Sequence, residues 1–139
     1  MRTFTRSIDI AAAPEHVWAV MRDVERWHEW TPSITSITRL DAGPFGVGSR
    51  VLIRQPKLPP NYSKVTEFEP AKRFTWVSRS PGVVATARHL IAASGAGSRV
   101  TLSVHFGGTL GWFVAWMVSG LTERYIAMEA EGLKKRVEG

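Results

Sequence analysis

The sequence contains no cysteine among its 139 residues, which excludes disulfide bonds and thiolate metal sites. Histidine is scarce as well: the four histidines show no ligand spacing such as HxxxH, so we expect neither a metal site nor another cofactor. The N-terminal segment MRTFTRSIDI lacks the apolar block of a signal peptide, and we therefore expect a cytoplasmic protein. The length suits one domain with its own hydrophobic core, over residues 1–139.

Long hydrophobic runs are also missing. The longest uncharged stretch of the C-terminal region extends from Phe106 to Thr122 and contains four glycines. A membrane-spanning helix needs roughly 20 consecutive apolar residues. We therefore do not expect this stretch to cross a bilayer.

Acidic residues are few in the middle of the chain. The formal net charge is +6, and between Arg50 and Arg99 nine lysines and arginines face two glutamates, a local balance of +7. Such a segment could meet nucleic acid or anionic lipid, but a solvated sheet face is the simpler interpretation, so we do not expect a nucleic acid partner.

The C-terminal region, Leu110 to Val137, has no proline and is predicted to form one helix about 40 Å long. Its first half is apolar on every side, so more than one surface must cover it. Trp112 and Trp116 are four residues apart and share a helix face. Core packing would explain them, and the alternative is a ligand gate or a transient membrane contact.

The N-terminal region is predicted to form a strand ending near Ile10 and a helix that opens at Pro14 and stops near Glu29. Short β-rich runs separated by turn signals follow, which indicates a β-meander. The predicted strands are Ser33–Leu40, Ser49–Gln55, Tyr62–Glu69, Arg73–Arg79, Val83–Ala92 and Arg99–Phe106.

Alternation along these strands divides their residues between two faces. One face is basic and should be wet. The other is mostly apolar and should be covered by the long helix, which predicts a two-layer α+β domain. The predicted inward residues are Val51, Ile53, Gln55, Ser63, Val65, Glu67, Phe74, Trp76, Ser78, Ala85, Ala87, His89, Ile91, Val100, Leu102, Val104 and Phe106.

Several of these inward residues are too small or too polar to fill a core. Ala85, Ala87, Ser63 and Ser78 leave space between sheet and helix, and unfilled space with a few polar groups is typical of a ligand pocket.

Seven segments follow one another along the chain: PEHVWAVMRDVERWHEWTPSI, GPFGVGSRV, RQPKLPP, VTEFEPAKRFTW, SPGVVATARH, SRVTLSV and EAEGLKKR. In this order, and over essentially the whole chain, the sequence resembles the polyketide cyclase/dehydrase group of the START-like (SRPBCC) superfamily. The resemblance implies a helix-grip fold, in which a curved antiparallel sheet wraps around a long C-terminal helix. It also implies a deep hydrophobic cavity gated by the loops near Trp27–Pro32 and QPKLPP. Members include aromatising cyclases, lipid and sterol carriers and regulators, and no catalytic motif transfers residue by residue.

Pairing the hairpins by their turns places Glu67 and His89 in one row across the sheet, on either side of Phe74 and about 10 Å apart. A ligand over Phe74 could touch both, and His89 could move a proton during an enolisation or dehydration. Alternatively, His89 bonds locally and Glu67 reaches solvent. The expected ligand-binding residues are Trp30, Gln55, Ser63, Phe74, Trp76, Ser78, Ala87, His89, Phe106, Met117 and Leu121.

The leading hypothesis is therefore a protein that binds a small hydrophobic molecule, such as a lipid or a polyketide-like cyclic or acyl compound. The second hypothesis is a cyclase or dehydratase that uses His89 and Glu67. A third is an interaction module whose basic face meets an acidic partner. An all-apolar cavity favours the first, an inward polar pair the second, and a filled cavity beside a continuous basic surface the third.

Overall fold

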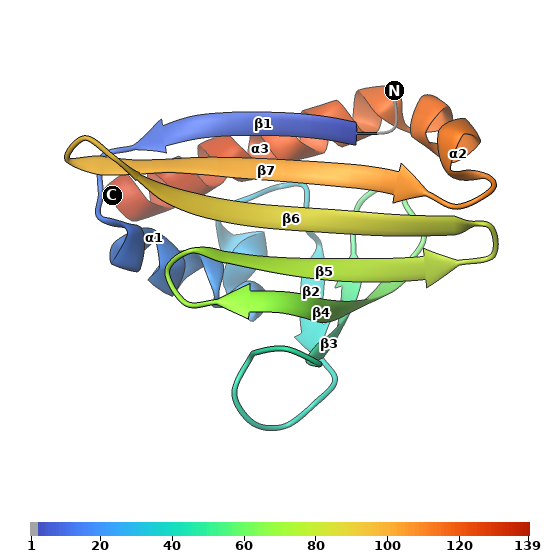
Figure 1. Ribbon diagram of the computed structural model, residues 1–139, viewed down its shortest axis with the longest axis horizontal. Helices are drawn as coiled ribbons and strands as arrows, with labels where there is room; N and C mark the ends of the chain where they lie inside the picture. Colours follow the sequence, from blue (N-terminus) through green and yellow to red (C-terminus); the bar gives the residue numbers. More distant parts are fainter. Residues whose placement is uncertain (1–2) are drawn as a thin grey trace.

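A seven-stranded antiparallel sheet forms one layer of the computed structural model, which describes residues 3–139 (Figure 1). The chain runs as a meander from β2 to β7, and β1 returns to the edge beside β7, giving the order β1-β7-β6-β5-β4-β3-β2. Met1 and Arg2, which the predicted domain includes, fall outside the described residues. The strands are β1 Thr3–Ile10, β2 Ser36–Arg39, β3 Arg50–Arg54, β4 Asn61–Glu69, β5 Arg73–Ser80, β6 Val83–Ser94 and β7 Gly97–Gly107.

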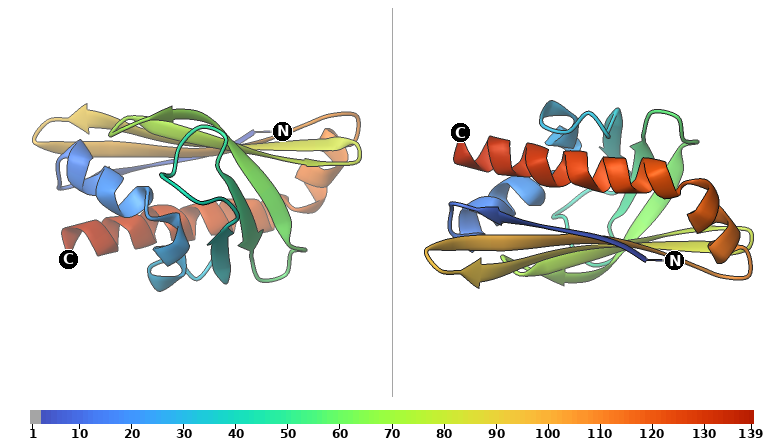
Figure 2. Two further views of the ribbon diagram at one scale, coloured as in Figure 1. Left: turned by 90° about the horizontal axis from the view of Figure 1, so that it is seen from below. Right: turned by 90° about the horizontal axis from the view of Figure 1, so that it is seen from above.

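The described helices all lie on one side of the sheet. The strands at the β2 end bend around α3, which crosses the concave face (Figure 2). This arrangement confirms the predicted α+β helix-grip fold. The helical segments are α1 Pro14–Met21, the 3-10 helix η1 Val24–Glu29, α2 Gly111–Met117 and α3 Ser119–Glu138.

The prediction of one continuous helix from Leu110 to Val137 is wrong. Val118 has φ −106° and ψ 13°, which lies outside the α-helical region and separates α2 from α3. At this point the chain turns, so that α2 covers the end of the sheet while α3 crosses its face (Figure 2). The break explains how a segment that is apolar on every side is accommodated: one straight helix could press only one face against the sheet.

Most of the predicted inward set is confirmed. Phe74, Val100 and Val51 are fully buried, whereas the charged side chains of the opposite face are exposed. Cross-strand pairs Phe74–His89 and His89–Leu102 confirm the predicted register of β5, β6 and β7. The exposed basic residues are Arg50, Arg54, Lys64, Arg79, Arg88 and Arg99.

Glu67 is the exception, and its predicted inward position is wrong. The register of β4 against β5 shifts between Val65 and Glu67, which is the signature of a β-bulge. The extra residue reverses the alternation, so Glu67 is exposed on the outer face and its carboxylate accepts a hydrogen bond from the Thr75 hydroxyl at 2.9 Å. Phe68, not Glu67, lies opposite Phe74.

The main hydrophobic core lies between the sheet, α1, η1 and the C-terminal half of α3. Aromatic rings dominate it: Trp27 of η1 contacts Phe74 and Trp76 at ring-centroid distances of 6.1 and 5.4 Å. A smaller cluster under α2 contains Phe4, Ala115 and Ile126. The interval between these two clusters is where packing is incomplete.

None of the helices within residues 3–139 is long and apolar enough to cross a lipid bilayer.

Candidate functional site

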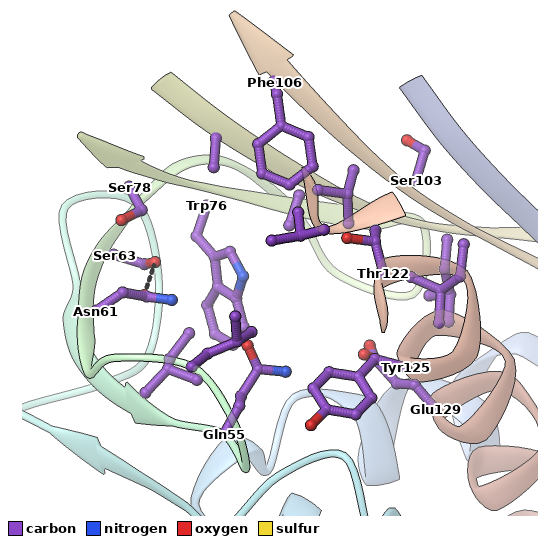
Figure 3. A pocket seen from close by; sticks show the side chains of 18 of the residues that line it. Gln55, Asn61, Ser63, Trp76, Ser78, Ser103, Phe106, Thr122, Tyr125 and Glu129 are labelled. Atoms are coloured by element: carbon purple, nitrogen blue, oxygen red, sulfur yellow. Dashed lines mark hydrogen bonds between the residues drawn. The ribbon is translucent and has the colours of Figure 1, made fainter. Parts of the chain in front are cut away.

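A cavity of about 400 Å³ lies between the concave face of the sheet and the α2–α3 junction. Its volume falls within the range of pockets that hold small organic molecules. Side chains from the sheet, from both C-terminal helices and from the β3–β4 loop surround it (Figure 3). Its apolar wall is formed by Trp27, Ile34, Ile53, Leu58, Pro59, Trp76, Ala85, Ala87, Leu102, Val104, Phe106, Val114, Met117, Val118 and Ile126.

The cavity exists because small residues stand where a closed core would need large ones. Ala87 pairs with Trp76 on β5 and with Val104 on β7, so that its methyl group leaves room over the centre of the sheet. Ser78 and Ala85 form the next pair toward the α2 end and are equally small. The vacant space lies above these positions, as their size predicts.

The β3–β4 loop forms one wall and is fastened to α3. The buried Tyr125 of α3 donates its hydroxyl to the carbonyl oxygen of Pro56. Leu58 and Pro59 of the same loop line the cavity, so this hydrogen bond holds a wall segment against the helix.

Polar groups are few and lie on two sides of the cavity (Figure 3). On the sheet side, the Ser63 hydroxyl donates to Oδ1 of Asn61 at 3.0 Å, and Nε2 of Gln55 donates to the carbonyl oxygen of Ser33 at 3.2 Å. On the helix side, Thr122, Tyr125 and Glu129 lie at spacings of three and four and therefore share one face of α3. Groups placed in this way could fix the orientation of a mostly apolar ligand.

His89 is held rigidly at the cavity wall. Its ring stacks on Phe74 at a centroid distance of 4.2 Å and an angle of 12°, and Trp27 and Trp76 contact its edges. Nδ1 lies 3.1 Å from the Phe74 carbonyl oxygen. Because a carbonyl can only accept, we assign the proton to Nδ1, which leaves the lone pair of Nε2 free to accept.

Glu129 faces that lone pair. Its Oε1 lies 3.6 Å from Nε2 of His89, and its side chain is only 14% exposed. Burial lowers the pKa of His89 to about 4, against the opposing effect of the bond to the Phe74 carbonyl. Burial raises the pKa of Glu129 to about 8. At neutral pH the pair is therefore an uncharged imidazole beside an uncharged carboxylic acid.

Sequence reasoning missed Glu129. The sequence does mark this residue, because it follows Tyr125 by four positions and so lies on the apolar stripe of the helix. A carboxylate in such a position needs a partner or a proton. Glu67, the residue expected to act with His89 on a shared ligand, is exposed on the outer face, and α3 places Glu129 beside His89 instead.

Most of the predicted ligand-binding residues line the cavity. Three do not. Phe74 is buried behind His89 in the core, Trp30 packs on Trp27 at 5.3 Å, and Leu121 is half-buried outside the lining. The predicted residues that do line the cavity are Gln55, Ser63, Trp76, Ser78, Ala87, His89, Phe106 and Met117.

Within residues 3–139, no three histidine, aspartate or glutamate side chains gather closely enough to hold a metal ion.

Comparison with known proteins identifies the family. The family described as "Polyketide cyclase / dehydrase and lipid transport" matches residues 1–138, and the chain belongs to it. A curated relative, an uncharacterized protein of Mycobacterium tuberculosis, is 32% identical over 50 residues, which are 36% of this chain and 30% of the relative. The match thus spans less than a third of that relative's length.

Solved structures show the same fold at low sequence identity. The Zhui aromatase/cyclase from Streptomyces sp. R1128 is 16% identical, with a TM-score of 0.82 over 99% of this chain and 93% of that one. A protein from Thermus thermophilus is 18% identical, with a TM-score of 0.78 over 97% and 96% of the two chains. A hypothetical protein from Helicobacter pylori is 14% identical, with a TM-score of 0.83 over 97% and 87%.

Proposed function

We propose that the protein binds a small, predominantly apolar molecule in the cavity between the sheet and the α2–α3 junction. The observation that carries this proposal is the cavity of about 400 Å³, whose wall is mainly aliphatic and aromatic. Burying apolar surface in such a site is favourable by roughly 25 cal/mol per Å². The Gln55 amide and the Thr122 hydroxyl line the cavity and supply hydrogen-bonding groups for a carbonyl or hydroxyl, which suits a cyclic or acyl compound that carries oxygen.

Binding of an apolar fluorescent probe tests this proposal directly. Trp76 lines the cavity, so an occupying probe should quench part of the tryptophan emission. Ala87→Phe should abolish that quenching because the ring would fill the space over the sheet. Native mass spectrometry of the purified protein would show whether a molecule is retained from the cell.

Ala92→Phe is the matched control. It makes the same change on the same strand at an exposed position outside this cavity. Overpacking can itself cost about 1–3 kcal/mol, so the melting temperature of both variants must be measured. Unchanged probe binding in a folded Ala87→Phe protein would refute the cavity as the binding site.

A second function, acid–base catalysis on the bound molecule, is favoured by the pair formed by His89 and Glu129. A carboxylic acid that stays protonated near neutral pH can donate a proton to a developing enolate or to a leaving hydroxyl. His89 offers an acceptor at Nε2, although its low pKa makes it a weak base. The fold that this chain shares with an aromatase/cyclase makes a cyclisation or dehydration the class of reaction to test.

Turnover of a poly-β-ketone substrate separates catalysis from binding alone. If the pair catalyses, Glu129→Gln and His89→Gln should each lower the rate by on the order of a hundredfold, with ligand affinity changed much less. If wild-type protein binds the substrate and leaves it unconverted, the protein is a binding protein and the enzyme hypothesis fails.

The third hypothesis, an interaction module, has less support. That hypothesis expects side chains to fill the space between the sheet and the helices, whereas a cavity of about 400 Å³ lies there. The basic face is also partly neutralised, since Arg50 pairs with Asp41 at 2.9 Å and Arg99 with Asp9 at 3.0 Å.

A further inference from the structure

Large apolar side chains on and beside α2 are exposed to solvent. Trp116, the most exposed of them, has a relative exposure of 71%. The rings are contiguous, because Phe113 lies 5.8 Å from Trp112 and 6.1 Å from Trp116 between ring centroids. We call this surface the α2 patch; it consists of Leu110, Trp112, Phe113, Trp116 and Met117.

The sequence of α2 is arranged to present this patch outward. The helix buries its small residues, Gly111 and Ala115, against the protein. A Cβ atom at Gly111 would lie 2.9 Å from the carbonyl oxygen of Phe106, so no larger residue fits there without a shift. An ordinary surface helix buries its large apolar residues. The reverse arrangement here leaves a contiguous apolar surface that none of residues 3–139 covers.

The patch adjoins the cavity. Val114 and Met117 of α2 line it, as do Val118 and Thr122 at the start of α3. Met117 is at once a patch residue and a wall residue, with an exposed fraction of 60%. A surface that covered the patch would therefore lie against the rim of the cavity.

The stretch of chain that contains the patch carries no acidic residue. No aspartate or glutamate occurs between Pro70 and Thr122. The β5–β6 turn abuts the patch, because a Cβ atom at Gly82 would lie 2.9 Å from Cδ1 of Leu110, and the exposed Arg79 stands just before that turn. On α3 the exposed Arg124 follows Glu123, the first carboxylate after the stretch. Of the other basic residues of the stretch, Arg88 lies in the middle of β6, while Lys72, Arg73 and Arg99 lie at the opposite end of the sheet, where Arg73 pairs with Glu69 and Arg99 with Asp9.

We propose that the α2 patch docks the protein on the surface of an anionic lipid bilayer. Tryptophan is favoured at the bilayer interface, and exposed apolar rings flanked by cations are the usual composition of interfacial anchors. A second copy of this chain fits less well, since a patch of five side chains is far smaller than the roughly 20–30 residues a side of a stable protein interface. If the cavity binds an apolar molecule, as proposed above, docking would place the rim of the cavity against the bilayer, in which apolar molecules dissolve.

Vesicle sedimentation tests the docking. Wild-type protein should sediment with vesicles of phosphatidylcholine mixed with phosphatidylglycerol, and more weakly with phosphatidylcholine alone. Its tryptophan emission should shift to the blue on binding, because Trp112 and Trp116 leave water. The double variant Trp112→Ser/Trp116→Ser should lose about tenfold or more in vesicle affinity. Raising the salt to about 0.15 M should weaken binding without eliminating it.

Val47→Ser is the matched control, since Val47 is a 69% exposed apolar residue on the β2–β3 loop, far from α2 (Figure 1). It should bind vesicles as the wild type does. Docking is overturned if wild-type protein binds neither vesicle, or if the double variant binds equally well. It is also overturned if the wild type forms a dimer that the double variant abolishes, because a second copy then covers the patch.

The apolar-probe assay is run in parallel on the double variant. Trp112 and Trp116 do not line the cavity, so probe binding should persist when vesicle binding is lost. Failure of docking can therefore be distinguished from failure of the proposed ligand binding.

Discussion

The lone pair of the His89 imidazole and the carboxyl group of Glu129 face each other in the cavity wall, with Nε2 3.6 Å from Oε1. Among residues 3–139 no charged side chain shifts the pKa of either group, and burial is the largest influence on the pKa of each. Two uncharged groups cost less to bury than an ion pair would, because each ion loses its hydration.

Stability should fall between about pH 6.5 and pH 8. The folded state holds the Glu129 proton up to a pKa of about 8, whereas the unfolded chain releases it near 4.5. In that window the folded state binds more protons, so the free energy of unfolding decreases as pH rises. His89 has the opposite effect between about pH 4 and 6.5, because its folded pKa is lowered. Above pH 6.5 only the Glu129 effect remains, at most about 2 kcal/mol.

Glu129→Gln should make stability nearly constant across that window, measured as urea unfolding midpoints at several pH values. Glu123→Gln, at an exposed position on the same helix, is the control and should retain the wild-type dependence. A Glu129→Gln protein that still loses stability between pH 6.5 and 8 would show that this carboxyl titrates normally.

Two local irregularities mark the limit of sequence-based prediction here. The meander from β2 to β7, the basic face and most inward residues follow from alternation and turn residues, whereas the pairing of β1 with β7 does not. Alternation fails at Glu67 because the bulge after Val65 adds a residue, and no glycine or proline marks it. Helical periodicity fails at Val118 because the break is imposed by the end of the sheet. The catalytic candidate Glu129 depends on how α3 is rotated over His89, which is a tertiary property.

Gly132 and Gly120 should respond oppositely to alanine, although both are in α3. A Cβ atom at Gly132 would overlap the Trp30 carbonyl oxygen, so Gly132→Ala must push α3 away from the segment after η1. Nothing lies within 4 Å of a Cβ at Gly120. There alanine should raise stability by up to about 1 kcal/mol through helix propensity.

Thermal unfolding of the two variants measures this contrast. Gly132→Ala should lower the melting temperature and Gly120→Ala should raise it or leave it unchanged. Equal effects of both substitutions would mean that the close approach of α3 to Trp30 is not present in solution.

Leu133 and Leu121 should also differ, because α3 buries them unequally. Leu133 is 1% exposed within the main core, whereas Leu121 is half-buried and outside both hydrophobic clusters. Leu133→Ala should cost roughly 2–5 kcal/mol of unfolding free energy, and Leu121→Ala clearly less. Chemical denaturation of the pair measures the difference. A larger loss for Leu121→Ala would require α3 to be rotated about its axis.

Tyr125→Phe should loosen the cavity wall without changing its shape. The substitution removes only the hydroxyl that donates to the Pro56 carbonyl, and the ring stays in the wall. Loss of one such hydrogen bond costs about 0.5–1.5 kcal/mol. Because the bond fastens the β3–β4 loop to α3, its loss should increase the frequency of loop opening.

Stopped-flow measurement of probe release follows that opening. The dissociation rate should rise by about tenfold, which is the factor expected if about 1.4 kcal/mol holds the loop closed. The association rate should rise as well, because the same opening admits the probe. The affinity should therefore change less than either rate. Tyr62→Phe removes the same hydroxyl from an exposed tyrosine that does not line the cavity and should leave both rates unchanged. If Tyr125→Phe leaves the release rate as it is in the wild type, the probe leaves by another path, and the rim formed by Val114 and Met117 becomes the exit to test.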